Sequence, residues 1–273
     1  MSNEDTIILE YRFDEELDIE LLHGYKKIIF SDFELNEKIF EQYANDEFVF
    51  PKYIENKFNR DVSNLPSSIT HLTFGYKFNR DVSNLPSSII YLIFGHDFNQ
   101  DVYVLPPFLT HLTFGSSFNR DVSNLPASIM YLTFGYDFNQ DIFVLPFSLT
   151  HLTFGYSFKQ EYNIPSSVKY LKLNSNNKYI INCLPNSIIE LELGNYFNLE
   201  VNNLPTSVKK LMIKNDYYNK DLNCLPDSIE ELYLNYNYYK HLMRIPSNLK
   251  KIICCEYYLF KNDFALYEVK TYR

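Results

Sequence analysis

Three evenly spaced histidines are the residues of this sequence that most readily suggest metal chemistry. His71, His111 and His151 recur every forty residues, and neutral imidazole is a common ligand of zinc. Shared coordination requires each ligand nitrogen to lie about 2 Å from one ion. The repeat described below separates neighbouring histidines by two strands, or about 9–10 Å. We therefore predict no metal site.

The four cysteines are the second candidate for chemistry. Cys183 and Cys224 hold the same repeat position two turns apart, which at about 9–10 Å is beyond the reach of a disulfide. Cys254 falls at a core position, and Cys255 beside it lacks the Cys-x-x-Cys spacing of a redox motif. The Walker loop, the His-Glu-x-x-His motif and the Gly-x-Ser-x-Gly motif are all missing from the sequence. We predict a protein that is not an enzyme, has no cofactor and keeps its thiols reduced.

A repeat of about twenty residues organises most of the chain. A typical unit, residues 58–77, reads FNRDVSNLPSSITHLTFGYK. A period of this length indicates a stack of turns, each burying its apolar side chains against its neighbours. Prolines mark ten units, with spacings of 19 to 21 residues: Pro66, Pro86, Pro106, Pro126, Pro146, Pro165, Pro185, Pro205, Pro226 and Pro246.

The apolar residues of each unit indicate one strand per turn. Residues 70–74 alternate between polar and apolar, which is the period of a strand with one buried face. Ile69, Leu72 and Phe74 then point inward, and Phe78 begins the return side. Twenty residues per turn leave no room for a long helix. The sequence predicts a β-rich fold, a leucine-rich-repeat-like parallel β solenoid of about ten 20-residue turns with irregular N- and C-terminal caps.

Three further columns of residues repeat with the proline. Glycine follows the strand, as at Gly75 and Gly95, which predicts a backbone position with positive φ. The asparagine column that begins at Asn59 predicts side chains that bond the backbone of neighbouring turns. The aspartate column from Asp61 to Asp141 predicts turn-stabilising or solvated side chains rather than a calcium cage, since calcium needs several oxygen ligands at once.

The repeat also resembles a known family. The run LPxSIxxLxFGxxFNxxV, over residues 58–254, resembles the FNIP repeat, a relative of the leucine-rich repeat that is abundant in amoebae and in the giant DNA viruses that infect them. The chain departs from the family pattern at Asp61 and its equivalents, where the family often has proline. The resemblance implies a parallel β solenoid and no reaction. Some members begin with an F-box, which docks them onto a ubiquitin ligase.

The two ends of the chain differ from the repeats. Residues 1–57 carry 15 acidic and 6 basic side chains, and residues 58–273 carry 19 of each, so the net charge of -9 belongs to the N-terminal segment. We predict an acidic N-terminal cap at 1–57, the solenoid at 58–254 and a C-terminal cap at 255–273. Within the first cap, residues 13–30 resemble a diverged repeat, and residues 34–47 have the pattern of a short helix.

A column of polar and aromatic residues five positions after each proline is the candidate binding site. These residues face outward from neighbouring strands about 4.8 Å apart, so their side chains form a ladder of rings followed by alternating charges. Avoidance of like-charge stacking explains this pattern as well as recognition does. The ladder consists of His71, Tyr91, His111, Tyr131, His151, Tyr170, Glu190, Lys210, Glu231 and Lys251.

These patterns favour a non-catalytic protein–protein interaction scaffold that binds its partner through the strand-lined face of the solenoid. Two alternatives stay open: a substrate-receptor subunit of a ubiquitin ligase, with residues 1–57 as the docking element, and a ligand- or carbohydrate-binding surface. The chain has no basic stripe, so we expect no nucleic-acid partner. We also expect no membrane partner, a monomer and a cytoplasmic location, because neither a long apolar span nor a secretory signal is found.

Overall fold

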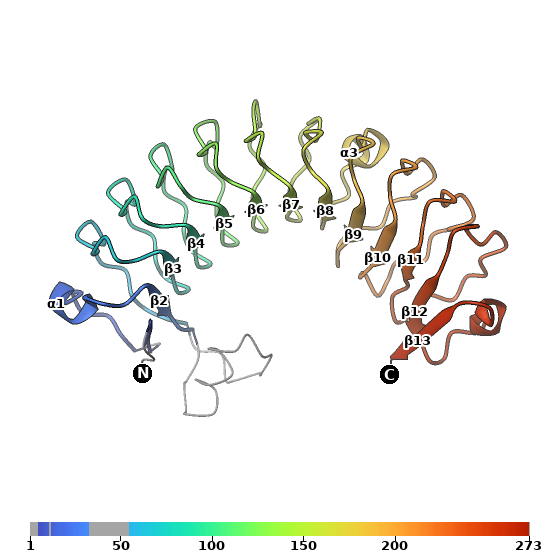
Figure 1. Cartoon of the computed structure of the whole chain (residues 1–273), viewed down its shortest axis with the longest axis horizontal. Coiled ribbons are helices and arrows are strands. Elements are labelled where there is room, and N and C mark those ends of the chain that lie inside the picture. The colour runs from blue at the N-terminus through green and yellow to red at the C-terminus, as the bar shows by residue number, and fades with distance from the viewer. Residues whose placement is uncertain (1–4, 11, 33–54, 273) are drawn as a thin grey trace. The chain divides into compact units, whose positions relative to one another are not determined.

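The computed structural model describes residues 5–10, 12–32 and 55–272, so the helix predicted at residues 34–47 lies outside the described residues. The chain divides into two compact units, Met1–Ser148 and Leu149–Arg273. Each unit is a stack of similar turns with one short strand per turn (Figure 1).

Unit 1 is built on a parallel sheet whose strands pair in chain order. Its first two strands precede the regular repeats, and Lys27 of the second strand pairs with His71 of the third. A one-turn helix lies between the first and second strands. The carboxylate of Asp18 caps this helix by accepting a hydrogen bond from the Glu20 amide at 3.1 Å. The elements are β1 (Thr6–Leu9), α1 (Ile19–Leu22), β2 (Lys27–Phe30), β3 (His71–Thr73), β4 (Tyr91–Ile93), β5 (His111–Thr113) and β6 (Tyr131–Thr133).

Unit 2 repeats this plan with strands that are also parallel and in chain order. Its α-helix begins where Asn177 replaces the phenylalanine of the repeat, and the Asn177 side chain accepts a hydrogen bond from the Ile180 amide. The elements are β7 (His151–Phe154), β8 (Tyr170–Leu173), α3 (Lys178–Asn182), β9 (Glu190–Leu193), β10 (Lys210–Ile213), β11 (Glu231–Tyr233), β12 (Lys251–Cys255), η1 (Lys261–Phe264) and β13 (Glu268–Tyr272).

Columns of stacked phenylalanine rings form the core of unit 1. Phe94 from the strand side and Phe98 from the return side stack with their centroids 3.7 Å apart, and both are almost fully buried. Neighbouring turns repeat this pair, so that Phe94 lies 5.8 Å from Phe114. The inward positions predicted from the sequence, including Ile69, Leu72 and Phe74, are buried. Each turn therefore completes its core with the turns on either side.

Polar side chains hold the return side of unit 1 together. The amide of Asn79 donates to the side-chain oxygen of Asn59 at 2.9 Å, and the next three asparagines repeat the bond. The predicted role of the asparagine column is confirmed. Asp61 accepts hydrogen bonds from the amide and the hydroxyl of Ser63, and these bonds lower the pKa of its carboxyl. The aspartate of that turn therefore stabilises the turn, as the sequence predicts.

The prediction of positive φ for the strand-end glycines is wrong. Among the described residues the positive-φ glycine is Gly24, which lies outside the column. The column exists because of close packing instead: a Cβ atom on Gly95 would lie 1.9 Å from the carbonyl oxygen of Gly75, and one on Gly115 would lie 1.7 Å from that of Gly95. Glycine is required here because neighbouring backbones leave no room for a side chain.

The predicted fold class is confirmed, since each unit is a parallel β solenoid with few and short helices. The described strands number six in unit 1 and seven in unit 2, more than the ten predicted turns. The additional strands are β1 and β2 before the regular repeats and β13 after them.

Candidate functional site

The first four ladder residues form one continuous ring stack on unit 1. His71 and Tyr91 have ring centroids 5.3 Å apart, Tyr91 and His111 are 4.0 Å apart, and His111 and Tyr131 are 4.1 Å apart, all within 18° of parallel. Adjacent parallel strands bring the rings to this spacing. Because each ring covers the face of the next, the stack presents ring edges to solvent, and three of the four residues are half-buried.

A threonine beside each ladder histidine holds its ring. The hydroxyl oxygen of Thr70 lies 2.8 Å from Nδ1 of His71 and 3.3 Å from the Lys26 carbonyl oxygen. Thr110 and Thr150 lie at the same 2.8 Å distance from the ring nitrogens of the histidines that follow them. Each threonine immediately precedes its strand and the ladder histidine that begins it, so the hydrogen bonds orient each ring.

Burial of the rings affects their protonation. Burial lowers the pKa of His71, and the positive charge of Lys27 on the neighbouring strand lowers it further. Burial also lowers the pKa of His151. A histidine is near half-protonated at about pH 6.5 in an unfolded chain, so the folded protein holds these two rings neutral under conditions in which an exposed histidine begins to ionise.

We expect this difference to make the protein less stable in mild acid. A lowered pKa stabilises the fold above the pKa of the unfolded histidine, and that stability is lost as the pH falls through the lower, folded value. The melting temperature should fall between about pH 7 and pH 5, and the double variant His71→Gln, His151→Gln should show a smaller fall. Thermal melts at several pH values measure this, and an unchanged slope in the variant would contradict it.

On unit 2 the ladder changes from rings to charges. His151 stacks on Tyr170 with a centroid distance of 4.0 Å. Glu190 follows on the next strand and forms an ion pair with Lys210 at 3.3 Å. Lys210 pairs in register with Glu231, and Glu231 pairs with Lys251. Opposite charges thus face each other from strand to strand, each contact contributing at most about 1 kcal/mol at a solvent-exposed surface.

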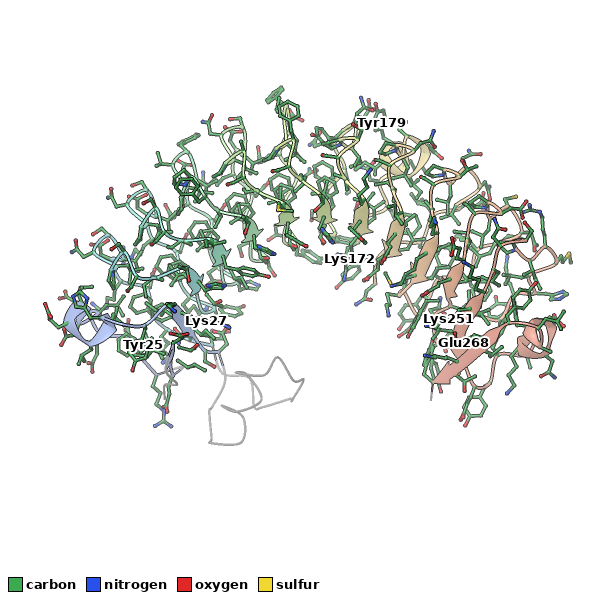
Figure 2. The ribbon with its side chains drawn as sticks, in the orientation of Figure 1. Tyr25, Lys27, Lys172, Tyr179, Lys251 and Glu268 are labelled. Atoms are coloured by element: carbon green, nitrogen blue, oxygen red, sulfur yellow. The ribbon has the colours of Figure 1, made fainter. Side chains whose placement is uncertain are left out.

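A second outward column lies two residues after the ladder, and the sequence analysis did not single it out. On unit 2 it includes Lys172 and Glu192, which form an ion pair at 2.7 Å, and Met212. The two-residue period of a strand puts this column on the same face as the ladder, so the sequence contained the signal. Figure 2 shows Lys172 and Lys251 on the strand side of unit 2, with Tyr179 of α3 on the opposite side.

The two columns of unit 2 enclose a shallow hollow of about 370 Å³. Its lining includes the rings of His151 and Tyr170, the charges of Lys172 and Glu190, and the apolar side chain of Met212. Aromatic, apolar and paired charged groups therefore meet at one place on the strand-lined face. Such a mixture is typical of protein-binding surfaces, which combine an apolar centre with a polar rim.

Neither the histidines nor the cysteines form a reactive cluster in the described part of the chain. No group of three or more His, Cys, Asp or Glu residues there is arranged to hold a metal ion. All four cysteines are free, with Cys183 and Cys224 exposed and Cys254 and Cys255 buried. The core position predicted for Cys254 is confirmed, and burial raises the pKa of its thiol, which makes that thiol unreactive.

The fold and this face define a leucine-rich-repeat-like solenoid, a class of protein that typically serves as a non-catalytic scaffold. The FNIP Repeat family matches residues 58–97, 81–117, 98–137, 120–157, 138–176 and 175–216. The chain belongs to the FNIP repeat family. The resemblance carried by the repeated LPxSIxxLxFG run is therefore confirmed.

A solved structure supports the same assignment. The crystal structure of CroV588, described as a novel circular LRR protein, is similar to this chain, with a TM-score of 0.71 and 33% sequence identity. The similarity covers 93% of this chain and 41% of CroV588, so the chain spans less than half the length of that protein. No curated protein sequence matches the chain. Among the described residues no helix is both long enough and apolar enough to cross a membrane.

Proposed function

We propose that this protein is a non-catalytic scaffold that binds a protein partner through its strand-lined face. The observation that carries the proposal is the ladder, together with the column beside it. Ring stacking, threonine contacts and ion pairs hold these outward side chains in place before binding. A pre-organised surface loses little conformational entropy when a partner binds.

The covered ring faces favour a protein over a carbohydrate as the partner. Stacking of a sugar on an aromatic platform needs an open ring face, whereas Tyr91 has His71 on one side and His111 on the other. The stack instead offers imidazole and phenol edges, which suit hydrogen bonds to polar side chains and backbone groups. On unit 2 the alternating charges suit a partner surface of complementary charge.

We place this scaffold in the cytoplasm. Two of its thiols, Cys183 and Cys224, are exposed, and exposed free thiols suit a reducing compartment. The ubiquitin-ligase alternative depends on residues 1–57 as a docking element, and residues 33–54 lie outside the described part of the chain. That alternative therefore becomes an outcome of the binding experiment below.

Removing two tyrosines from the ladder should weaken partner binding at least about tenfold. The change is Tyr91→Ser together with Tyr131→Ser, which deletes two of the four rings in the unit 1 stack. The fold should survive, because both side chains project from the outer face of the sheet. Affinity capture from the native cell with mass spectrometry identifies the partner, and calorimetry with the purified partner measures the change.

A matched control is Tyr239→Ser, because Tyr239 is exposed and lies outside the strands. The control should bind with wild-type affinity. Equal affinity of the double variant for the partner would remove the ladder from the proposal. Capture of ubiquitin-ligase subunits that survives the double variant would favour the receptor alternative instead.

A further inference from the structure

A second candidate surface lies on the loop side of unit 1. In Figure 1 the loops that connect β4 to β5, and those that follow β6, reach away from the strands. Counting turns by their prolines from Pro66, the third and fifth turns each expose three large apolar side chains there, with exposed fractions between 55% for Tyr103 and 87% for Phe147. We term them the third-turn ridge and the fifth-turn ridge. The ridges consist of Tyr103, Val104 and Phe108, and of Phe143, Val144 and Phe147.

Small and polar residues fill the equivalent positions of the second and fourth turns. Ser83 and Asn84 replace the exposed pair in the second turn, and Ser123 and Asn124 replace it in the fourth. Ala127 stands in the fourth turn where Phe147 stands in the fifth. Over four consecutive turns the surface thus alternates between a trough and a ridge.

The charges alternate with the same two-turn period. The trough turns carry exposed arginines, Arg80 and Arg120, and their aspartates are hydrogen-bonded to serines of the same turn. The ridge turns carry glutamine in place of arginine. Their exposed aspartates, Asp101 and Asp141, form no hydrogen bond or ion pair with any residue in the described part of the chain. Each trough turn therefore presents an arginine beside a serine-bound aspartate, and each ridge turn presents an exposed carboxylate without an adjacent arginine.

Comparison of the two ridges indicates that their apolar character has been retained. Residues 78–117 and 118–157 are copies of one another that match at 31 of 40 positions. The ridge positions have diverged between the two copies. Pro107 and Phe108 of the first copy align with Phe147 and Ser148 of the second. Each copy nevertheless exposes two aromatic rings. Drift without a function would not be expected to keep exposed rings while moving one of them, since exposed apolar clusters favour unwanted association.

We propose that these turns bind a second copy of the chain about a two-fold axis. The axis lies between the third and fourth turns, perpendicular to the stacking direction. Rotation about this axis reverses the order of the turns in the second copy. Residues at the same position within a turn then face each other across the axis. The third-turn ridge then enters the fourth-turn trough of the second copy, and the fifth-turn ridge enters its second-turn trough. The same operation puts Asp101 opposite Arg120 of the second copy, and Asp141 opposite Arg80.

The ridges and troughs bind a second copy of the chain because this surface complements its own image in shape and in charge. A two-fold interface requires this self-complementarity, since each residue contacts the symmetry equivalent of its partner. A lipid surface offers no counterpart to the polar troughs, and the exposed carboxylates of the ridges oppose insertion into an anionic membrane. This dimer would replace the monomer that the sequence predicts. It uses the loop side, so it does not depend on the proposal for the strand-lined face.

Charge variants provide the decisive experiment. An acidic variant carries R80D and R120D, and a basic variant carries D101R and D141R. Wild-type protein should sediment as a dimer in analytical ultracentrifugation, and each variant alone should be a monomer because like charges then meet across the axis. A mixture of the two variants should form a heterodimer, because every cross-axis pair is again opposite in sign. Contacts within one chain cannot produce recovery that depends on mixing.

The apolar part is tested by F143S together with F147S, which should raise the dimer dissociation constant at least about tenfold. Both side chains are exposed, so circular dichroism melts should match the wild type. A wild-type protein that is monomeric at its solubility limit would overturn the proposal. So would variants that dimerise as well as the wild type, or a mixture that stays monomeric. A monomer that co-floats with phosphatidylcholine vesicles would assign the ridges to lipid instead.

Discussion

Replacing Phe114 by alanine will lower the free energy of unfolding by about 3–5 kcal/mol. The Phe114 side chain is 2% exposed and stacks on Phe118 with a centroid distance of 3.7 Å. It also lies 5.8 Å from Phe94 and 6.0 Å from Phe134 in the adjacent turns. The substitution leaves a cavity between three turns, and a stacked backbone cannot collapse to fill it without breaking the strand pairing on either side.

Because each turn contacts mainly its neighbours, the damage should be local at first. Hydrogen exchange should accelerate most in β4, β5 and β6, and the thermal melt should broaden or shift to lower temperature. Tyr217→Ala is the control, because that side chain is 85% exposed and its loss should change the melt little. An unchanged melt and unchanged exchange in the Phe114 variant would contradict the packing described here.

The sequence predicts the fold well because one rule is repeated many times. A single turn with Ile69, Leu72 and Phe74 would be weak evidence for a strand, but ten copies in register leave few alternatives. The inward positions, the parallel order of the strands and the roles of Asn59 and Asp61 all follow from that repetition. Repetition also makes the outward column visible, because residues five positions after the proline must be neighbours in a parallel stack.

What the sequence does not reveal depends on distances between backbones and between side chains. The spacing of the prolines cannot show that the rings of Tyr91 and His111 lie 4.0 Å apart with their faces covered. The hollow beside Lys172 requires the second outward column, whose place two residues after the ladder can be read from the sequence but whose side-chain contacts cannot. The sequence also does not identify the ridges as a surface, because their alternation looks like a trace of duplication until their exposure is known.

The strand-end glycines show most clearly how a correct position can be given a wrong cause. Glycine is required either where φ is positive or where another backbone approaches too closely for a Cβ atom. The sequence cannot separate these cases, because both produce the same column. The structure does separate them: Gly115 has no positive φ, and an added Cβ would lie 1.7 Å from the Gly95 carbonyl oxygen and 2.4 Å from its carbonyl carbon.

Gly115→Ala should therefore lower the free energy of unfolding by at least about 3 kcal/mol, the upper part of the range for overpacked sites. The atoms in the way belong to the backbone, so no side chain can rotate aside, and the second and third turns must move apart. That separation should weaken the strand pairing of β4 with β5 and loosen the phenylalanine stack between them. Thermal unfolding and hydrogen exchange of β4 and β5 measure the effect.

Gly24→Ala is the matched control, because it separates strain from clash. Gly24 has a φ of 95°, and a Cβ atom added there would meet nothing within 4 Å. Its substitution should cost about 1–2 kcal/mol through backbone strain alone. If close packing explains the column, the Gly115 variant must be the less stable of the two even though its φ suits alanine. Equal losses, or a larger loss at Gly24, would mean that the turns can separate freely and that the column has another cause.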